Sequence, residues 1–531
     1  MAEYLNPVVF ADYSDPDVIR VGDTYYMTAS SFHFTPGLPL LMSKDLVNWR
    51  LVGYAAKSIP LAQFNFPRHS KGIWAPSLRY HDGKFVIVVG LPDEGIFVTE
   101  ATDFTGEWTP LKCIKEARGF IDPCPFWDAD GKAYIVHAYA KSRIGFKSRL
   151  GIFEIDPKTM EAISDDEFIF IGDDSQPTIE GPKVYKRGAF YYIFAPAGGV
   201  KQGWQVELRS FSIKGPFSEQ IVLEQGNSHI NGPHQGGLVE NPDGSAYFIH
   251  FQDRGVYGRV ILLEPALWRG GWCVMGTAVK SEELIGEPVD KGYVPEISKG
   301  ENLLGVSATE CCDDFMNGKI GLQWQWQANV CESDYIAPSA ESGLHLLCKN
   351  KNLGNLWNIP NVLSEKIVFE DFFAEIEMNV ADLHDGERVG AIFLGGQYAG
   401  IEVHNTHGVY QFCYIESFTD PSDEELRMEK IIAIESGELK NKEKIKFVID
   451  FASLPPNEKA VDTHSADAEK PSSGTCTFGA EVDGIMLKTA AKPYLCGGDH
   501  WVGGKIGFYA QGETGSVIVK RVKVSPKPKN W

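Results

Sequence analysis

Five segments in the first half of the chain resemble one another, and this repeat limits the possible fold more than any other feature. Each reads as a short strand, a tight turn and a second strand rich in aromatic and β-branched residues. Their first residues are Asp15, Ala75, Asp122, Glu180 and His234. The turns carry Gly22, Gly83, Gly131, Gly188 and Gly244, as hairpins require of residues that tolerate positive φ.

The spacing within the repeat predicts that the five leading residues occupy equivalent places. Each turn glycine follows its leader by 7, 8, 9, 8 and 10 positions, and successive leaders lie 60, 47, 58 and 54 residues apart. This is slightly longer than the roughly 40 to 50 residues of a four-stranded propeller blade. We therefore expect an all-β fold that begins with a five-bladed β-propeller, in which the leaders converge near the axis.

The second half of the chain follows a different pattern. From about residue 286 the sequence is rich in glycine, proline and charge, which is typical of a linker, and short strands separated by turn signals follow it. This pattern predicts a C-terminal β-sandwich. We expect a propeller catalytic domain over residues 1–298 and a sandwich accessory domain over residues 306–531, since 531 residues are too many for one core.

Charge and motif content exclude several classes of function. A net charge of −21 disfavours nucleic acid and anionic membranes as partners, because both would repel the chain. The start has no signal-peptide pattern, which predicts a cytoplasmic protein if this N-terminus is native, and a secreted or periplasmic one if a signal peptide was removed. Ten cysteines without a C-x-x-C motif indicate neither a disulfide framework nor a zinc site. The sequence also lacks the H-E-x-x-H, G-x-S-x-G and P-loop motifs.

Acidic residues lead three of the five repeats, at Asp15, Asp122 and Glu180. A buried group of carboxylates is costly unless it performs chemistry or binds a cation. Asp-Pro pairs are common in turns, so the pair at Asp15 or at Asp122 carries little weight by itself. Their place in the repeat is what makes these residues candidates for an active site.

Several blocks of the sequence resemble glycoside hydrolase family 43, the β-xylosidases and α-L-arabinofuranosidases. They are the opening NPVVFADYSDPDVIRVGDTYYMTA, Trp74-Ala75-Pro76, Asp122-Pro123, Glu180-Gly181-Pro182 and GPHQGGLVE around His234. The resemblance implies a propeller followed by a sandwich. It also implies that Asp15 is the general base, that Glu180 is the general acid, and that Asp122 tunes the pKa of the acid and orients the sugar. Arg259 is similar to a family arginine that approaches the sugar.

Inverting hydrolysis requires a protonated acid and an ionised carboxylate on opposite faces of the sugar, roughly 6.5 to 9.5 Å apart. Asp15 and Glu180 lead non-adjacent blades, so such a gap is natural, and Asp122 is the candidate for the like charge that keeps the acid protonated. The resemblance further implies one structural Ca²⁺ in the propeller channel, with His234 as a candidate ligand, and no organic cofactor. Many family members have Gly-His-Gly where this chain has Pro233-His234-Gln235.

Aromatic and basic residues near the leaders are candidates for binding the sugar. Apolar sugar faces stack on aromatic rings, which suggests roles for Trp74, Phe32 and Phe34, although a place in the core explains isolated aromatics equally well. His234 could hydrogen-bond the sugar or simply pack beside the axis. Arg259 could bind the sugar or form a structural ion pair.

The leading hypothesis is an exo-acting, inverting glycosidase that releases xylose, arabinose or both from xylan-derived oligosaccharides. One alternative is a strict α-L-arabinofuranosidase that acts on arabinoxylan or arabinan. An alternative of another class is a carbohydrate-binding propeller without catalysis. The three carboxylates argue against this last reading.

Overall fold

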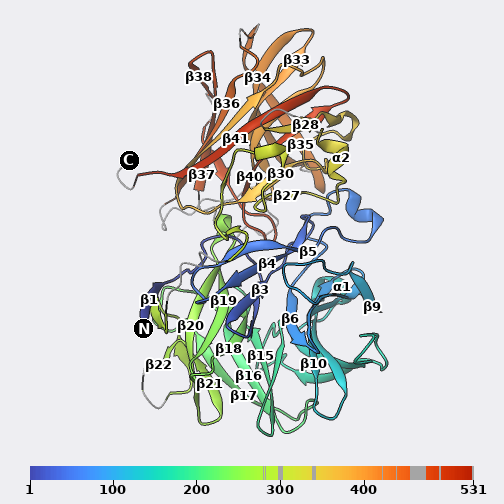
Figure 1. The fold of residues 1–531 in the computed structure, drawn as a ribbon, viewed down its shortest axis with the longest axis vertical. Coiled ribbons are helices and arrows are strands. Elements are labelled where there is room, and N and C mark those ends of the chain that lie inside the picture. The colour runs from blue at the N-terminus through green and yellow to red at the C-terminus, as the bar shows by residue number, and fades with distance from the viewer. Residues whose placement is uncertain are drawn as a thin grey trace. The chain divides into compact units, whose positions relative to one another are not determined.

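The computed structural model is all-β and divides into two compact units (Figure 1). It describes residues 1–528 apart from 279, 281–282, 297–302, 338–342, 421, 438, 440, 455–473 and 490–491. Unit 1 comprises Met1–Pro60, Lys71–Asp253 and Arg259–Ala308, and unit 2 comprises Leu61–Ser70, Arg254–Gly258 and Thr309–Trp531. The predicted boundaries at 298 and 306 stay a prediction, because residues 297–302 lie outside the described residues.

Among the described residues of unit 1 are five sheets that each contain four consecutive antiparallel strands, and these are the five predicted blades. The first has β2 (Asp17–Val21), β3 (Thr24–Thr28), β4 (Gly37–Ser43) and β5 (Arg50–Ala56), with β25 (Val306–Ser307) paired to β5. The second has β6 (Pro76–His81), β7 (Lys84–Leu91), β8 (Gly95–Ala101) and β9 (Lys112–Glu116), and the third has β10 (Phe120–Trp127), β11 (Ala133–Tyr139), β12 (Arg149–Ile155) and β13 (Glu167–Ile171). The short helix α1 (Lys141–Ile144) joins β11 to β12.

The remaining two blades complete the propeller. The fourth has β14 (Lys183–Arg187), β15 (Phe190–Ala197), β16 (Trp204–Ser210) and β17 (Ser218–Glu224), extended by β23 (Gly286–Glu287) and β22 (Thr277–Ala278). The fifth has β18 (His234–Glu240), β19 (Ala246–Asp253), β20 (Arg259–Arg269) and β21 (Trp272–Met275). All five predicted turn glycines have positive φ, which confirms the hairpins of the repeat.

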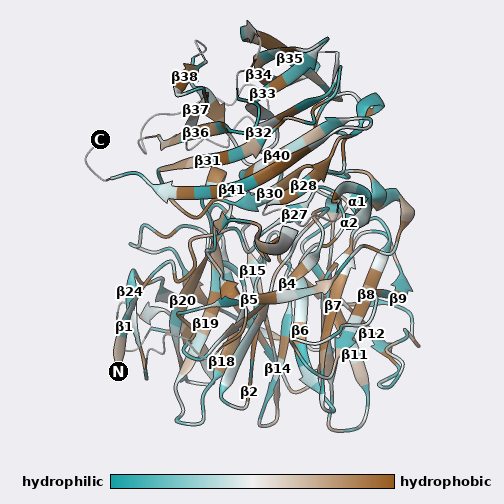
Figure 2. Cartoon of the chain, turned by 45° about the horizontal axis from the view of Figure 1, so that its top comes forward, coloured by the Kyte–Doolittle hydropathy of each residue, from teal (hydrophilic) through white to brown (hydrophobic). Residues whose placement is uncertain are grey.

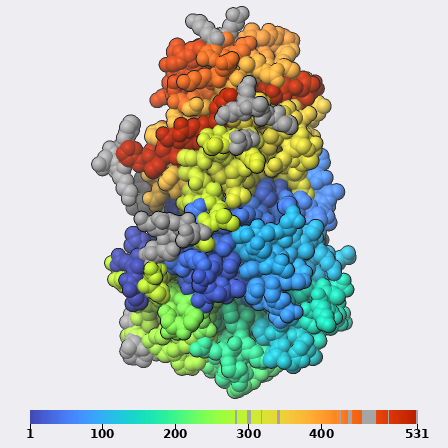
Figure 3. All heavy atoms as spheres, viewed as in Figure 1, coloured from blue at the N-terminus to red at the C-terminus, as the bar shows by residue number. Residues whose placement is uncertain are grey.

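The first strands of the blades form a ring. Contacts run from β2 to β6, from β6 to β10 and from β10 to β14, and β18 contacts both β15 and β2, so that the last blade meets the first. The ends of this unit are joined as well, because β1 (Ala2–Leu5) pairs with β24 (Lys291–Val294). In Figure 3 the dark blue N-terminal residues accordingly lie beside yellow-green residues.

Buried charged residues connect the innermost strands of four blades. Asp17 of β2 is fully buried and accepts hydrogen bonds from the Leu78 backbone N–H (2.7 Å) and from Nη1 of Arg79 (2.8 Å). Nζ of Lys183 lies 3.6 Å from the same carboxylate and donates to Oγ of Ser77 at 2.7 Å. Arg79 also donates to Sγ of Cys124 on β10. The buried carboxylate is therefore paired with two cations of the chain itself.

Unit 2 is built from two antiparallel sheets of a β-sandwich. One contains β26 (Cys312–Asp313), β41 (Ser516–Pro526), β31 (Phe372–Asn379), β36 (Ile445–Ser453), β37 (Gly474–Val482), β38 (Ile485–Lys488), β28 (Leu344–Leu347) and β39 (Tyr494–Cys496). The other contains β27 (Gln325–Trp326), β30 (Leu363–Lys366), β40 (Lys505–Gly512), β32 (Arg388–Leu394), β33 (Tyr398–Thr406), β34 (Val409–Asp420), β35 (Asp423–Gly437) and β29 (Lys349–Asn350), the last of which pairs parallel to β40. Helix α2 (Glu332–Tyr335) precedes β28.

The core of the sandwich follows from strand periodicity. Side chains of β31 and β36 alternate between buried and half-buried positions, so each strand turns one face inward. Phe451 of β36 stacks on Phe372 of β31 at 4.9 Å and faces Phe393 of β32 at 6.1 Å, which joins the two sheets. Figure 2 shows hydrophobic residues concentrated on the strands and hydrophilic residues on many connecting loops. Among the described residues, no helix is long and apolar enough to cross a membrane.

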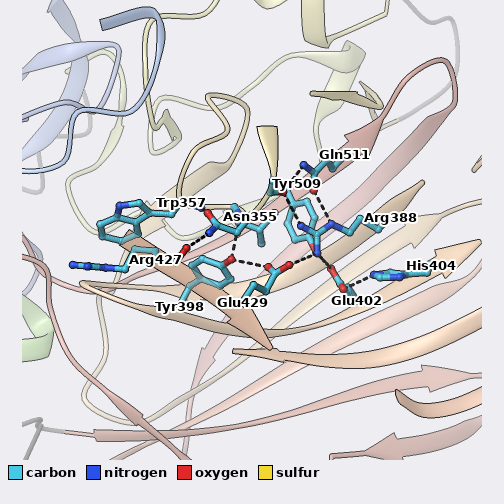
Figure 4. Close-up of polar contacts among 12 residues, drawn as sticks. Asn355, Trp357, Arg388, Tyr398, Glu402, His404, Arg427, Glu429, Tyr509 and Gln511 are labelled. Atoms are coloured by element: carbon cyan, nitrogen blue, oxygen red, sulfur yellow. Dashed lines mark hydrogen bonds and ion pairs between the residues drawn. The ribbon is translucent and has the colours of Figure 1, made fainter. Parts of the chain in front are cut away.

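The sandwich also buries a cluster of polar side chains, shown in Figure 4. Arg388 donates to Glu429 at 2.7 Å and to Gln511 at 2.6 Å, and it lies 3.5 Å from Glu402. The Tyr398 hydroxyl donates to Glu429 at 2.6 Å. Glu402 further binds Tyr509 and His404. The buried Glu402 and the half-buried Glu429 therefore each have several partners within the cluster.

Candidate active site

The predicted catalytic residues lie where the first strand of a blade begins, and the backbone there is unusual. Asp15 and Asp122 both have φ of 54°, in the left-handed region that non-glycine residues adopt rarely. Gly181, directly after Glu180, has φ of 55°. Strained backbone of this kind is concentrated at functional sites, because it aims side chains in directions that a regular strand does not allow.

Asp15 is held by two donors from different parts of the propeller. Nη1 of Arg259, at the start of β20, donates to its Oδ1 at 2.9 Å, and Oγ of Ser30 donates to its Oδ2 at 2.5 Å. Arg259 is positioned in turn by Asp12, which accepts the backbone N–H of Arg259 at 2.9 Å, and its guanidinium lies 4.6 Å from the Phe251 ring centroid. Only 8% of the Asp15 side chain is exposed. These contacts fix the orientation of this carboxylate.

Asp122 and Glu180 are neighbours in space. Oδ2 of Asp122 accepts the backbone N–H of Gly181 at 2.9 Å, which places it beside the residue that follows Glu180. Burial raises the pKa of Asp122 well above its usual range, and the negative charges of Glu180 and Asp15 raise it further. The structure therefore places both Glu180 and Asp15 close enough to Asp122 for their charges to act on it. Asp122 is buried, whereas 29% of the Glu180 side chain is exposed.

His234 contacts Glu180 directly, since its Nε2 lies 3.0 Å from Oε1 of Glu180. The imidazole is 1% exposed, and its Nδ1 is buried without a hydrogen-bond partner among the described residues. The contact places the histidine beside the predicted acid. The strand pairing shifts between His234 and Gly236, which is a bulge at the start of β18.

The predicted aromatic residues are buried near the start of the second blade. The backbones of Phe32 and Ile73 exchange two hydrogen bonds of 2.8 Å, which places Phe32 beside the residue that precedes Trp74. The guanidinium of Arg143 lies 5.0 Å from the Trp74 ring centroid. Phe34 packs against His33, with ring centroids 4.2 Å apart. Contact of Trp74, Phe32 or Phe34 with a sugar stays a prediction.

Ser30 was missed by the sequence analysis, although a signal for it was present. Asp17 pairs with Thr28 in the first hairpin, so extending that register by two residues places Ser30 opposite Asp15. Asp12 had no comparable signal, because its contact with the backbone of Arg259 joins positions 247 residues apart.

The residues around His234 do not fit the Ca²⁺ that the family resemblance implies. Calcium requires six to eight oxygen ligands, but Nε2 of His234 faces Glu180 and its Nδ1 is a nitrogen. Asp17, the carboxylate between the first strands, is already paired with Arg79 and Lys183. Among the described residues, no group of three or more His, Cys, Asp or Glu side chains is arranged to hold a metal. We therefore assign no catalytic step to a metal.

Comparison with known proteins gives consistent results for both units. The family model "Glycosyl hydrolases family 43" matches residues 4–273, and a "Beta xylosidase C-terminal Concanavalin A-like domain" matches residues 312–519. A protein of Xylanibacter ruminicola is 39% identical over 371 residues, which are 69% of this chain and 66% of that protein. A protein of Formosa agariphila named "Beta-xylosidase" is 31% identical over 465 residues, which are 78% of this chain and 77% of that protein.

Among solved structures, the xylan β-1,4-xylosidase of Bacillus halodurans matches with a TM-score of 0.79 and 18% identity, covering 98% of this chain and 99% of that one. At this identity the match establishes the fold alone. It agrees with a five-bladed propeller and a sandwich in one chain. The family model covers the propeller with its three convergent carboxylates, and the chain therefore belongs to glycosyl hydrolase family 43 and is a glycoside hydrolase that acts on carbohydrates.

Proposed function

We propose that this enzyme releases xylose, arabinose or both from the non-reducing ends of xylan-derived oligosaccharides, with inversion at the anomeric carbon. The observation that carries the proposal is the convergence of Asp15, Asp122 and Glu180 from three different blades. The name "Beta-xylosidase" of the Formosa agariphila relative supports a pentose as the sugar released.

Glu180 is the general acid in this proposal. It is the most exposed of the three carboxyl groups, so its proton can reach the oxygen of the leaving group. His234, 3.0 Å away, orients the carboxyl. Asp15 is the general base: Arg259 and Ser30 hold its carboxylate in place to take a proton from the attacking water.

Asp122 is too buried to act on the leaving group and serves the other two carboxylates. Its carboxyl group, next to Glu180, either carries a negative charge or shares one proton with Glu180. It also accepts a hydrogen bond from the Gly181 N–H, which fixes the backbone next to Glu180. In the proposed cycle the glycosidic C–O bond breaks as the proton of Glu180 moves to the leaving oxygen, water forms the new bond to the anomeric carbon, and Asp15 receives a proton of that water. Exchange with solvent then removes the proton from Asp15 and returns one to Glu180. No further cofactor is needed for this balance.

The test is hydrolysis of nitrophenyl β-D-xyloside and nitrophenyl α-L-arabinofuranoside by the wild-type chain. Turnover of the xyloside supports the proposal, and turnover of both supports a bifunctional enzyme. Activity on the arabinofuranoside alone would favour a strict α-L-arabinofuranosidase. If neither compound is hydrolysed but xylo-oligosaccharides bind, the chain is a carbohydrate-binding propeller and the proposed chemistry is wrong.

A further inference from the structure

Gln235 lies between His234 and Gly181, the residue that follows Glu180. It follows His234 at the bulge of β18, has φ of 40° and is 3% exposed. Its side chain packs on Gly181: a Cβ built on Gly181 would lie 2.8 Å from Cδ and 3.1 Å from Nε2 of Gln235. Gly181 is the residue that joins Glu180 to Asp122 through its backbone N–H. The amide of Gln235 is therefore held directly against the catalytic backbone.

The amide nitrogen of Gln235 has no hydrogen-bond partner in the described part of the chain, although it is buried. An unsatisfied buried donor is costly, so a protein retains one only where something else compensates. Two neighbouring side chains show the same deficit, since Nδ1 of His234 and Nε of Arg259 are also buried without partners there. Both of these side chains contact a predicted catalytic carboxylate. Three of the buried nitrogens without partners among the described residues thus belong to side chains that contact the predicted catalytic carboxylates or the backbone beside them.

A buried glutamine elsewhere in the chain behaves differently. The amide nitrogen of Gln327 in the sandwich donates to the carbonyls of Leu356 and Ile359, both at 3.0 Å. The donors of that side chain serve the fold, although its Oε1 is itself buried without a partner among the described residues. Nε2 of Gln235 serves no group of the protein that the structure describes, so a purely structural function does not explain it.

We propose that Nε2 of Gln235 donates a hydrogen bond to a hydroxyl of the sugar whose glycosidic bond is cleaved, and that Gln235 thereby selects sugars that carry this hydroxyl. The inference rests on the proposed function and adds a specificity residue to it. A site built to bond a hydroxyl rejects an analogue that lacks it, because the buried donor is then left unpaired.

The first test replaces the amide by an apolar side chain of similar length, Gln235→Met. We expect kcat/KM on the pentoside that wild type hydrolyses to fall about tenfold to a hundredfold, the size of one lost hydrogen bond to a buried polar group. The thermal unfolding midpoint should stay unchanged or rise, since no hydrogen bond within the protein is lost. A structural residue would lower the midpoint instead. Gln235→Asn, which keeps a shorter amide, should lose less activity than Gln235→Met.

Gln220→Met is the matched control. The amide nitrogen of Gln220, on the outer strand β17, donates to the carbonyl of Ile221 at 2.8 Å, and we expect this variant to retain wild-type kcat/KM. A loss of activity equal to that of Gln235→Met would contradict the inference, because it would show that any such replacement disturbs the propeller.

The second test uses nitrophenyl glycosides that each lack one sugar hydroxyl. Wild type should hydrolyse each deoxy substrate with a lower kcat/KM than the parent glycoside. For the one substrate that lacks the hydroxyl bound by Gln235, Gln235→Met should show no such drop, whereas the drops for the other deoxy substrates should be the same in both proteins. Equal penalties in both proteins at every position would overturn the inference, as would wild-type kcat/KM for Gln235→Met. Inactivity of wild type on both pentosides would contradict the proposed function instead, so the two failures can be told apart.

Discussion

The propeller and the sandwich each bury a cluster of charged side chains, but the two clusters are satisfied in different ways. In the sandwich, Arg388 pairs with Glu429 and lies beside Glu402, and each of these carboxylates also accepts a hydrogen bond from a tyrosine hydroxyl (Figure 4). In the propeller, three carboxylates converge, and buried nitrogens beside them are left without partners in the described residues. A closed network serves stability, whereas an incomplete one leaves groups free for a ligand.

The pKa shifts of the two clusters have opposite signs. Asp122 and Glu402 are both buried, and burial alone would raise the pKa of each. The charge of Arg388 overcomes this effect and lowers the pKa of Glu402, whereas the neighbouring carboxylates raise that of Asp122. Burial raises the pKa in both cases, and the sign of the neighbouring charges then decides whether this effect is reinforced, as in Asp122, or reversed, as in Glu402.

Mutation of the catalytic pair should have the largest effect. We expect Glu180→Gln and Asp15→Asn each to lower kcat/KM on the hydrolysed pentoside about 10³-fold, as loss of a general acid or base does. Thermal stability of Glu180→Gln should stay close to wild type, because this side chain is partly exposed. Asp15→Asn should be less stable, because it leaves the buried Arg259 without its carboxylate. The control is Glu240→Gln, which alters an exposed carboxylate that pairs with Arg187. Activity of either variant within tenfold of wild type would show that the carboxylate roles are wrong.

The sandwich cluster should respond in the opposite way. Arg388→Leu leaves the buried Glu402 and the half-buried Glu429 without their cation, so we expect about 3 to 5 kcal/mol of lost stability for the sandwich. Denaturant unfolding followed by tryptophan fluorescence measures this loss, and kcat of the folded enzyme should be unchanged. The exposed Arg521→Leu serves as the control. If Arg388→Leu unfolded like wild type, the cluster would contribute nothing to stability and the comparison would fail.

Another buried carboxyl, that of Glu207 on β16, links pH to the stability of the propeller. Burial raises its pKa to about 8, against the opposing effects of the Cys273 backbone N–H and Arg209. The folded state thus keeps a proton that the unfolded state has lost above its ordinary pKa of about 4.5, so stability should fall as the pH rises from about 4.5 to about 8. We expect Glu207→Gln, which mimics the protonated form, to be more stable than wild type at pH 9. The advantage should shrink toward pH 5, and an equal advantage at every pH would contradict this explanation.

Removal of metals should have the smallest effect. Asp17 is neutralised by Arg79 and Lys183, so the axis of the propeller contains its own cations. We expect the thermal unfolding midpoint and kcat to remain the same after dialysis against EDTA and after addition of Ca²⁺. A midpoint that falls with EDTA and recovers with Ca²⁺ would show that a structural calcium is bound after all.

The sequence predicted the blades well because the repeat is local. A hairpin is fixed by the alternation of its strands and by its turn glycine, and both are visible within about 15 residues. The order of the leaders around the axis then follows from the order of the blades, which is why Asp15, Asp122 and Glu180 could be identified as one cluster. The family blocks added their separate roles.

Contacts between side chains distant in sequence could not be predicted. The pair of Lys183 with Asp17, which argues against the expected calcium, joins the fourth blade to the first, and no periodicity marks it. The position of the Gln235 amide, whose nitrogen has no hydrogen-bond partner among the described residues, depends on the bulge at the start of β18 and on the absence of a Cβ at Gly181. Such details arise from how strand ends pack in three dimensions, which a pattern of residue types does not encode.

The most direct test of the central claim is the anomeric form of the sugar first released. Proton NMR of wild-type hydrolysis in D₂O, recorded before mutarotation, should show α-xylose from a β-xyloside, because water attacks the face opposite the leaving group when Asp15 acts as base and Glu180 as acid. First appearance of β-xylose would mean that a carboxylate acts as a nucleophile and that Asp15 and Glu180 do not have the roles given to them here.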